Sequence, residues 1–540
     1  MNQLSPQTQK LISRYKLWYQ SLQPQEGVST IHVDEVASTV AGFYEKIRTV
    51  VDWKEEHLMR RAAIIRKIKR RLLGWDLNKF AAKEEIAEPL VLELIRGGHF
   101  PNDKIPETKI AEVSGVINKY IFILKNSPEQ GMSREKLQFY NWIFEITACE
   151  IEEVLAQFRR EGALIDYMFD LMKERIKVNE GVISIGGLKE EKKNIQIYIA
   201  IQQALFKLDK PIISYNLIKY KYPQWRQASA EWLSEIVKDI YKIWYEIEKD
   251  LSHPLAKKFY TICERYDTPY LLLGDILSEG NPEETAKKIA IPETLETLIK
   301  NAYNKRLSTL KARLSRAAFY STLSILLTNS LSLIILEIPL AKLITGTFRP
   351  ITILVDILGP TLLMFLFTVT IKLPTKSNLG VVLLEAMKIV YKSEKIDTYE
   401  VKITRKRGIL TKLIISLIYL LGAFVSFGAV VWIFEFVSFP PTSVVINIMF
   451  VALIVFAGLA IRKRAQELTV EERPTGFLGF LFDILFLPVA ATGRWLSNNW
   501  KKYNAIAAFF NAMIDMPFSI FVEFLEQWRF FLKEKKEEIH

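Results

Sequence analysis

Hydrophobic and polar positions divide the 540 residues of the chain into two parts with different patterns. Up to residue 316, apolar residues recur every three or four positions among many charged ones, which is typical of amphipathic helices. From residue 317 onward, several long runs carry no charge, which is typical of helices that cross a membrane. The pattern predicts an all-α fold in which a cytosolic helical domain precedes an α-helical multi-pass membrane domain.

Four apolar runs are long enough to cross the hydrocarbon core, because a spanning helix needs about 20 residues. The runs at 317–336, 413–434 and 443–461 contain no charged residue, and the run at 351–371 contains one, Asp356. We therefore expect four spans, arranged as two transmembrane hairpins at 317–372 and 409–463.

The loop between the hairpins, 373–408, has a pattern of its own. Ser377 and Asn378 are good N-cap residues for a short helix over 379–391. The segment TYEVKIT, at 398–404, alternates weakly between polar and apolar residues and predicts a short strand.

Basic residues beside the four runs predict the orientation, because lysine and arginine concentrate on the cytoplasmic side of a membrane. They precede the first run, fill the loop 373–408 and follow the fourth run, whereas the two opposite loops contain only Lys342 and Arg349. The first 20 residues lack the apolar core of a signal peptide. We expect a plasma-membrane protein with both termini and the loop in the cytoplasm.

Two further apolar segments, 475–493 and 504–522, lie in the C-terminal region 464–540. If both crossed the membrane, Arg494, Lys501 and Lys502 would lie outside, against the charge rule. We therefore expect interfacial or re-entrant helices here, although two more crossings remain the alternative. An amphipathic tail follows, since its apolar residues are spaced by three and four positions: Phe518, Phe521, Leu525, Trp528 and Leu532.

The first 316 residues divide into an N-terminal segment, 1–30, and a mainly helical domain, 31–316, with a candidate internal boundary near 125–133. The clearest helix pattern covers 133–161, with Gly162 where a C-terminal cap would stand. Long helices of this kind form either an interface with another chain or antiparallel packing within one domain. We expect a protein partner or a second copy of the chain to bind this domain.

The segment RRAAIIRKIKRR, at 60–71, holds seven basic residues in twelve. It can bind anionic lipid, RNA or an acidic protein, or it can be a solvated helix face with neighbouring acids. A net charge of +12 is moderate for this length and is explained by cytoplasmic loops, so we do not expect nucleic acid as a partner. The candidate contact patch consists of Arg60, Arg61, Arg66, Lys67, Lys69, Arg70 and Arg71.

No signature of catalysis stands out. The motifs GxxxxGK[ST], HExxH and GxSxG are absent, and the five histidines never pair at ligand spacing. The two cysteines, Cys149 and Cys263, exclude a disulfide framework and a cysteine-based zinc site. We expect neither an enzyme nor a bound cofactor or metal.

Acidic residues within the apolar runs are the remaining candidates for a functional site. Asp356 lies six residues after Pro350, and its burial requires pairing with Arg349, Lys342 or water. It marks either an ion or proton site or a polar contact between helices. Asp483 marks the water boundary if its segment is interfacial, and becomes a functional candidate if that segment spans.

Two functions remain from this reading. The first is a non-enzymatic, membrane-anchored scaffold or assembly protein that acts through its cytosolic helical domain. The alternative is a channel or transporter that uses Asp356 and Asp483.

Overall fold

The computed structural model describes residues 3–23, 27–34, 56–73, 86–128, 133–156, 160–178, 189–344, 350–371, 373–391, 397–401, 409–439, 441–470, 477–502 and 528. The described chain is 83% helical, as the sequence predicts, and three of its helices are long and apolar enough to cross a membrane. They are Pro292–Ile335, Leu413–Phe436 and Ser443–Arg464, and the helix at Ile353–Val369 is apolar but shorter.

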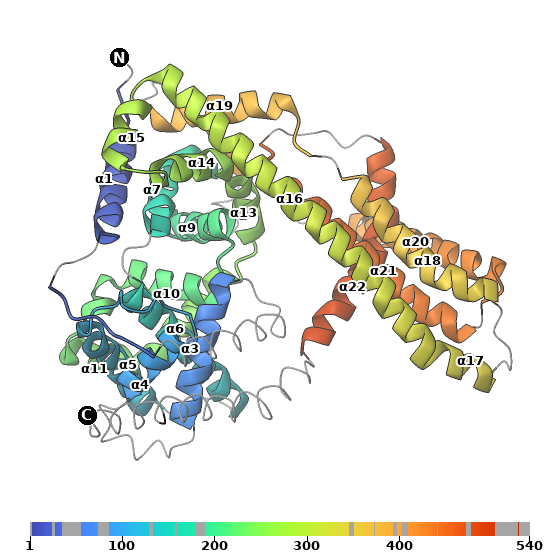
Figure 1. The fold of residues 1–540 in the computed structure, drawn as a ribbon, viewed down its shortest axis with the longest axis horizontal. Helices are drawn as coiled ribbons and strands as arrows, with labels where there is room; N and C mark the ends of the chain where they lie inside the picture. The colour runs from blue at the N-terminus through green and yellow to red at the C-terminus, as the bar shows by residue number, and fades with distance from the viewer. Residues whose placement is uncertain are drawn as a thin grey trace, which may run out of the picture.

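The N-terminal half forms a helical domain (Figure 1). Its elements are α1 (Pro6–Ser21), α3 (Glu56–Leu73), α4 (Ala87–Arg96), α5 (Thr108–Asn126), α6 (Ser133–Leu155), α7 (Arg160–Arg175), β1 (Ile176–Val178), α9 (Glu190–Phe206), α10 (Lys210–Lys221), η3 (Pro223–Gln227), α11 (Ala230–Lys238), α12 (Ile240–Leu251), α13 (Ala256–Arg265), α14 (Asp267–Ser278) and α15 (Pro282–Ile289).

The C-terminal half forms what we call the apolar bundle, which begins within α16. The bundle consists of the second half of α16 (Pro292–Ser332), η4 (Leu333–Glu337), α17 (Ile338–Ile344), α18 (Pro350–Val369), α20 (Ile409–Phe436), α21 (Pro441–Arg464) and α22 (Phe477–Lys502). The loop between the hairpins contains α19 (Lys376–Val390) and β2 (Tyr399–Val401).

Two hydrophobic cores hold the helical domain together. The first core lies between α3, α4, α5, α6, α10, α11 and α12, so the helices on both sides of 125–133 share it. The second core lies between α1, α7, α13, α14, α15, α19 and the first half of α16. Helix α9 contributes Ile195 and Ile199 to the first core and Ile197 and Ile201 to the second, because successive residues of a buried helix face different neighbours.

The second core continues into the apolar bundle. Met364 of α18 and Ile454 and Ile461 of α21 belong to it, together with residues of the helical domain. Close packing of this kind resists relative movement, because protein interiors are as dense as organic crystals. The domain and the bundle are therefore joined by packed side chains of α16 and of the end of α21, rather than by a loose linker.

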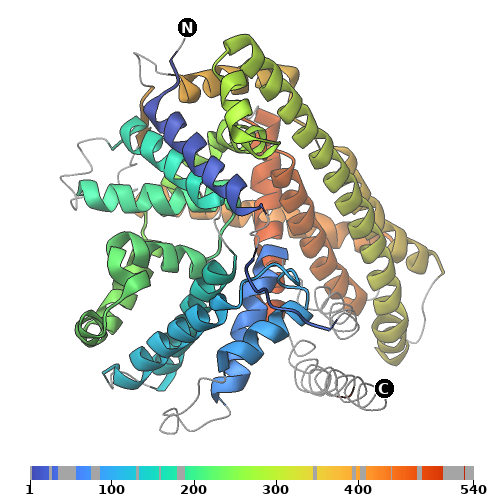
Figure 2. The same cartoon turned by 60° about the vertical axis from the view of Figure 1, so that its left-hand side comes forward.

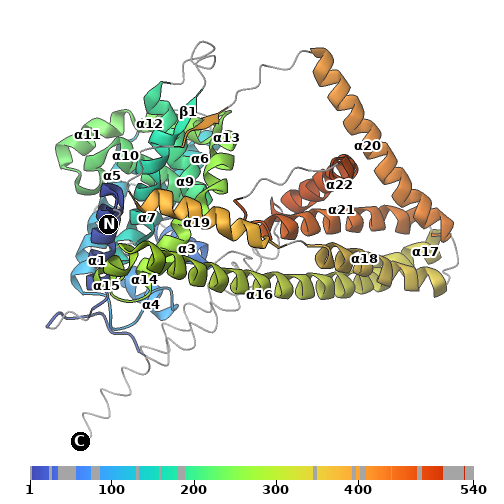
Figure 3. The ribbon, with the colours of Figure 1, turned by 90° about the horizontal axis from the view of Figure 1, so that it is seen from above.

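Helix α16 is the main physical connection. It runs without interruption from the second core, where Leu295, Ile299 and Tyr303 are buried, into the apolar bundle beside α18 and α21. Figures 1 and 2 show this long helix leaving the domain, and Figure 3 shows it running alongside α18 and α21. Its 41 residues extend for roughly 60 Å at 1.5 Å per residue. The boundary expected between residues 316 and 317 therefore lies inside a continuous helix.

The loop between the hairpins folds onto the helical domain. Helix α19 covers almost the whole range expected, although Thr375, rather than Ser377 or Asn378, is its N-cap residue. The predicted short strand is β2, which pairs in parallel with β1 through Ile176 and Tyr399. Parallel strands need a distant partner, and here the partner lies more than two hundred residues earlier in the chain.

Asn378 is buried and joins three parts of the structure. Its amide donates to the Tyr303 hydroxyl of α16 at 3.0 Å and to the Leu468 carbonyl, after α21, at 2.7 Å. Its side-chain oxygen accepts from the Val470 amide at 2.8 Å. Because every polar atom of this side chain is used, Asn378 fixes α19 against both connections to the bundle.

Helix α22 packs inside the apolar bundle, against both α20 and α21. Ile484 packs on Gly422 at the middle of α20, and Ser426 donates to the Leu485 carbonyl at 2.7 Å. A Cβ on Gly493 would overlap the Ala452 carbonyl at the middle of α21. The first of the two extra apolar segments, 475–493, thus lies against the centres of two candidate spans. The second, 504–522, and nearly all of the amphipathic tail fall outside the described residues.

Candidate functional site

Five polar side chains are fully buried between α16, η4, α18 and α21, where their surroundings are otherwise apolar. They form what we call the polar cluster: Asn329, Glu337, Asp356, Ser443 and Asn447. Each comes from a helix that packs against at least one of the others, since α18 contacts both α16 and α21. A polar group in this environment has a high desolvation cost, which makes such residues candidates for function.

Hydrogen bonds connect only part of the cluster. Asn447 donates from its amide nitrogen to the Asp356 carboxylate at 2.5 Å and to the Ser443 carbonyl at 3.1 Å. Asn329 donates from its amide nitrogen to the backbone carbonyl of Asp356, also at 2.5 Å. Asp356 is therefore held from two sides by carboxamides.

Six oxygen atoms of the cluster have no hydrogen-bond partner in the described part of the chain. They are Glu337 Oε1 and Oε2, Asp356 Oδ2, Asn329 Oδ1, Asn447 Oδ1 and Ser443 Oγ. Native proteins leave few buried polar atoms unpaired, so a group of six calls for an explanation. All six can accept, and the only free donor among them is the Ser443 hydroxyl, which lies near Glu337, so the acceptors of the cluster outnumber its donors.

Glu337 reaches the cluster from an irregular turn. Residues Leu333–Glu337 form a π-helix, and the Ile338 amide donates to the Leu333 carbonyl five residues earlier. Pro339 explains this turn, because its ring would clash with the carbonyl four residues earlier in a regular α-helix. Single π-turns are rare and are frequent at functional sites.

The cluster lies near the end of the bundle that is farther from the helical domain. Asp356 is six residues into α18 and Asn447 is six residues into α21, and each position is about 9 Å from its helix start. Glu337 lies at the end of the long helix that begins in the domain. A cation entering from that end would cross less than half of the bundle.

The basic partners expected for Asp356 do not define the site. Arg349 lies outside the described residues, and Lys342 is an exposed residue of α17 that forms no ion pair with Asp356 in the described chain. The structure instead surrounds Asp356 with Asn329 and Asn447, two residues that sequence reasoning missed. Their signal was present, because each is a lone carboxamide inside an otherwise apolar run.

Asp483 lies within α22, and its side chain is outside the described part of the structure. The neighbouring Ile484 packs on α20, whereas the polar cluster is built from α16, η4, α18 and α21. The pairing of Asp356 with Asp483 in one ion pathway therefore remains a hypothesis.

The basic segment of α3 is not a continuous surface, which corrects the contact-patch hypothesis for two of its residues. Arg61 and Lys67 are buried. Arg61 pairs with Asp209 and with Glu152, the latter at 3.3 Å, and Lys67 pairs with Glu93 at 2.9 Å. Buried charges need such partners, and these acids come from segments distant in the sequence.

The other basic residues of α3 are partly buried or outside the description. Arg60 donates to the His99 carbonyl at 2.9 Å and stacks over a phenylalanine ring, and Lys69 donates to Asn141 at 2.6 Å. Burial lowers the pKa of Lys69. Arg66 is partly buried and also interacts with other groups of the chain. The side chains of Arg70 and Arg71 lie outside the described part of the structure.

Another buried acid lies where the helical domain meets the end of α21. Asp267 opens α14 and is 3% exposed, and Cys263 beside it is fully buried. Burial raises the pKa of Asp267 to about 8, although the charge of Lys207 acts in the opposite direction. Thr268 donates to Asp267 at 3.2 Å and to the Glu467 carbonyl, after α21, at 3.4 Å.

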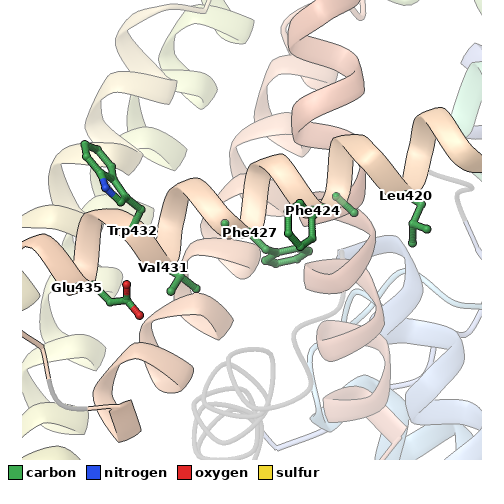
Figure 4. Close-up of a pocket in the computed structure, with 8 residues that line it drawn as sticks. Leu420, Phe424, Phe427, Val431, Trp432 and Glu435 are labelled. Carbon is green, nitrogen blue, oxygen red and sulfur yellow. The ribbon is translucent and has the colours of Figure 1, made fainter.

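The outer face of α20 carries a shallow apolar groove with a volume of about 620 Å³ (Figure 4). Phe424, Phe427, Val431 and Trp432 line it, with Glu435 at one end. Phe424 is 78% exposed and Trp432 is 67% exposed, which is the arrangement of a helix face in contact with lipid. The groove offers a single carboxylate, so it is a weaker chemical site than the polar cluster.

The described residues contain no group of three or more His, Cys, Asp or Glu side chains that could hold a metal ion. A cation in the polar cluster would therefore depend on amide and hydroxyl oxygens beside the two carboxylates. Comparison with protein-family models, with curated proteins and with solved structures gives no match. The function must therefore be argued from these residues and their geometry.

Proposed function

We propose that the chain is a plasma-membrane protein with four spans and with both termini in the cytoplasm. The first, third and fourth spans are the three long apolar helices. Helix α18 is the second, since its 20 residues from Pro350 to Val369 are sufficient to cross. The basic residues at the domain ends of these helices support a cytoplasmic helical domain.

We further propose that this protein moves a cation across the membrane. The observation that carries this proposal is the polar cluster, in which six buried oxygens have no partner in the described structure. Two carboxylates without a described basic partner are too costly to retain in an apolar bundle for structure alone. Cation pathways are a common reason for such groups to occur within a membrane protein.

The connection between the cluster and the helical domain supports regulated movement. Glu337 ends the helix that begins inside the second core, and α18 and α21 contribute to that same core. A rearrangement of the domain is therefore transmitted to three of the elements that form the cluster. In this proposal, the domain sets the probability that the pathway is open.

Ion flux through liposomes that contain the purified full-length protein tests the proposal. Radioactive sodium and calcium and a pH-sensitive dye together cover the small cations. We expect flux of at least one cation, reduced at least tenfold by Asp356→Asn and by Glu337→Gln. Glu435→Gln is the matched control, because it removes an exposed acid from α20. Equal flux in the wild type and in both cluster variants would refute the proposal.

A membrane-anchored assembly protein is the second candidate function. It is favoured by the helices around the first core, because no residue of the apolar bundle belongs to that core and the outer faces of these helices are a separate surface on which a partner could bind. Chemical crosslinking of the full-length protein in its native membrane tests this candidate. Reproducible crosslinks from α11 or α12 to one other protein support it, and crosslinks confined to the chain itself count against it.

Removal of residues 317–540 is a poor test of assembly. Helix α19 contributes Val382, Ala386 and Ile389 to the second core, and Leu468 and Val470 also belong to it. Truncation would expose this core to water, since burial of each large aliphatic side chain stabilises by about 1.5–3 kcal/mol. We expect the truncated domain to aggregate, so the full chain must be used.

A further inference from the structure

We propose that the polar cluster binds one hard divalent cation of the calcium type, directly through side-chain oxygens of α16, η4, α18 and α21. This inference deepens the proposed cation transport and rests on it for its biological meaning. The binding itself is a property of the cluster and can be measured without flux. It is carried by three features: the identity of the free atoms, their orientation and their total charge.

The free atoms are all oxygens. Two carboxylates, two carboxamide oxygens and one hydroxyl supply six of them, with no nitrogen or sulfur atom among the six. Hard cations such as calcium bind six to eight oxygens of these kinds, and calcium often accepts both oxygens of one glutamate. Zinc and copper prefer histidine and cysteine, neither of which belongs to the cluster.

Hydrogen bonds fix the orientation of both carboxamides. The nitrogen of Asn447 is used by Asp356 and Ser443, and the nitrogen of Asn329 is used by the Asp356 backbone. Each amide therefore presents its oxygen as the free end. Two carboxamides held in this way lose little side-chain entropy on binding a cation, because their orientations are already fixed.

Charge decides between monovalent and divalent cations. Glu337 and Asp356 are both fully buried in the cluster, and the described chain shows no ion pair to either carboxylate. Their ionised forms carry two negative charges inside an apolar bundle. One divalent cation neutralises both charges, whereas one sodium ion leaves a net charge whose burial costs several kcal/mol.

Complete burial favours calcium over magnesium. All five side chains are inaccessible to solvent. Magnesium demands near-ideal octahedral geometry and usually keeps several of its waters, whereas calcium accepts irregular sets of protein oxygens at 2.3–2.6 Å. Glu337, which would supply two of the oxygens, comes from the π-helical turn at Leu333–Glu337, and calcium tolerates such irregular ligand positions better than magnesium does.

Equilibrium binding of radioactive calcium to the chelator-treated full-length protein in detergent tests the inference. We expect one saturable site per chain, which unlabelled calcium displaces at least tenfold better than magnesium or sodium. Asp356→Asn and Glu337→Gln should each weaken binding at least tenfold, whereas Glu435→Gln should leave it unchanged. Asn447→Asp, which keeps the oxygen ligand, should retain binding that Asn447→Leu abolishes.

The outcomes separate this inference from the proposed function. Calcium binding that depends on the cluster, without flux of any cation, supports the inference and removes the transport proposal. Flux of sodium or protons in a protein that binds no calcium overturns the inference and leaves transport standing. Calcium binding that is unchanged in both acid variants also overturns it. Melting temperatures of all variants, measured without calcium, identify any variant that fails to fold.

Discussion

Asp267 allows a quantitative test of the contact between the helical domain and the apolar bundle. Its pKa is raised by burial from 3.8 to about 8, so the folded protein keeps this proton where the unfolded chain has lost it. The folded state then binds more protons than the unfolded state, and stability falls as pH rises. The contribution is fully present below about pH 4 and is lost by about pH 8.

The size of the effect follows from the two pKa values. Each pH unit between them changes the free energy of unfolding by about 1.4 kcal/mol, which gives roughly 5 kcal/mol over the whole window. Asp267→Asn keeps the shape of the protonated acid and removes the titration. We expect this variant to match the wild type at pH 4.5 and to be more stable by up to roughly 5 kcal/mol at pH 8.

Alkylation of Cys263 provides the assay, because this thiol is fully buried and lies beside Asp267. The wild-type rate at Cys263, divided by the rate in Asp267→Asn at the same pH, cancels the general increase of thiol reactivity with pH. Mass spectrometry resolves Cys263 from Cys149 of the first core, whose rate shows whether the opening is local or global. The ratio of wild type to variant should rise between pH 5 and pH 8. A ratio that stays constant with pH would refute the reasoning.

Three further substitutions, the first with a control, test the packing. Gly493→Leu should separate α22 from α21 and lower the melting temperature by several degrees, whereas Gly428→Ala, with nothing within 4 Å, should not. Asn378→Leu leaves the Tyr303 hydroxyl and two backbone groups without their partner, so urea titration should show a loss of about 2–4 kcal/mol. Arg61→Ala removes one partner of the buried Glu152, which Arg60 also approaches at 3.6 Å, and one partner of the partly exposed Asp209. It should cost about 1–3 kcal/mol in the same titration, and no measurable change would contradict the buried network.

Periodicity and hydrophobic length predicted much of the fold. The apolar run at 413–434 lies within α20, the run at 443–461 lies within α21, and the loop contains both the expected helix and the expected strand. These features depend on residues near one another in the sequence, which is why a linear pattern can show them.

Helix ends were harder to predict. Helix α6 ends at Leu155, although its pattern continues to 161, and Gly162 lies inside α7 rather than in a cap. The boundary at 316 was placed by a change in composition, yet α16 continues through it. A change from charged to apolar residues reports a change in surroundings and need not interrupt the backbone hydrogen bonds.

The residues whose surroundings the sequence did not predict are those that depend on tertiary contacts. The charges of Arg61 and Lys67 predicted a surface patch. The linear sequence does not show that Asp209 and Glu93, which pair with them, lie against α3 in the fold. The polar cluster likewise joins residues from 329 to 447, and only the packing of α16, α18 and α21 brings them together. Asp356 was identified from sequence, since one acid within an apolar run is already unusual.

The uninterrupted α16 also has a mechanical consequence. From residue 316 to Glu337 the helix and its π-turn extend for about 30 Å, so they act as a lever with its pivot at the domain. A tilt of about 5° at the pivot moves the far tip by about 2.5 Å, which is the length of one calcium–oxygen bond. In the proposed site, a tilt of α16 that slides it along α18 would therefore change the distance between the Glu337 carboxylate and a bound cation.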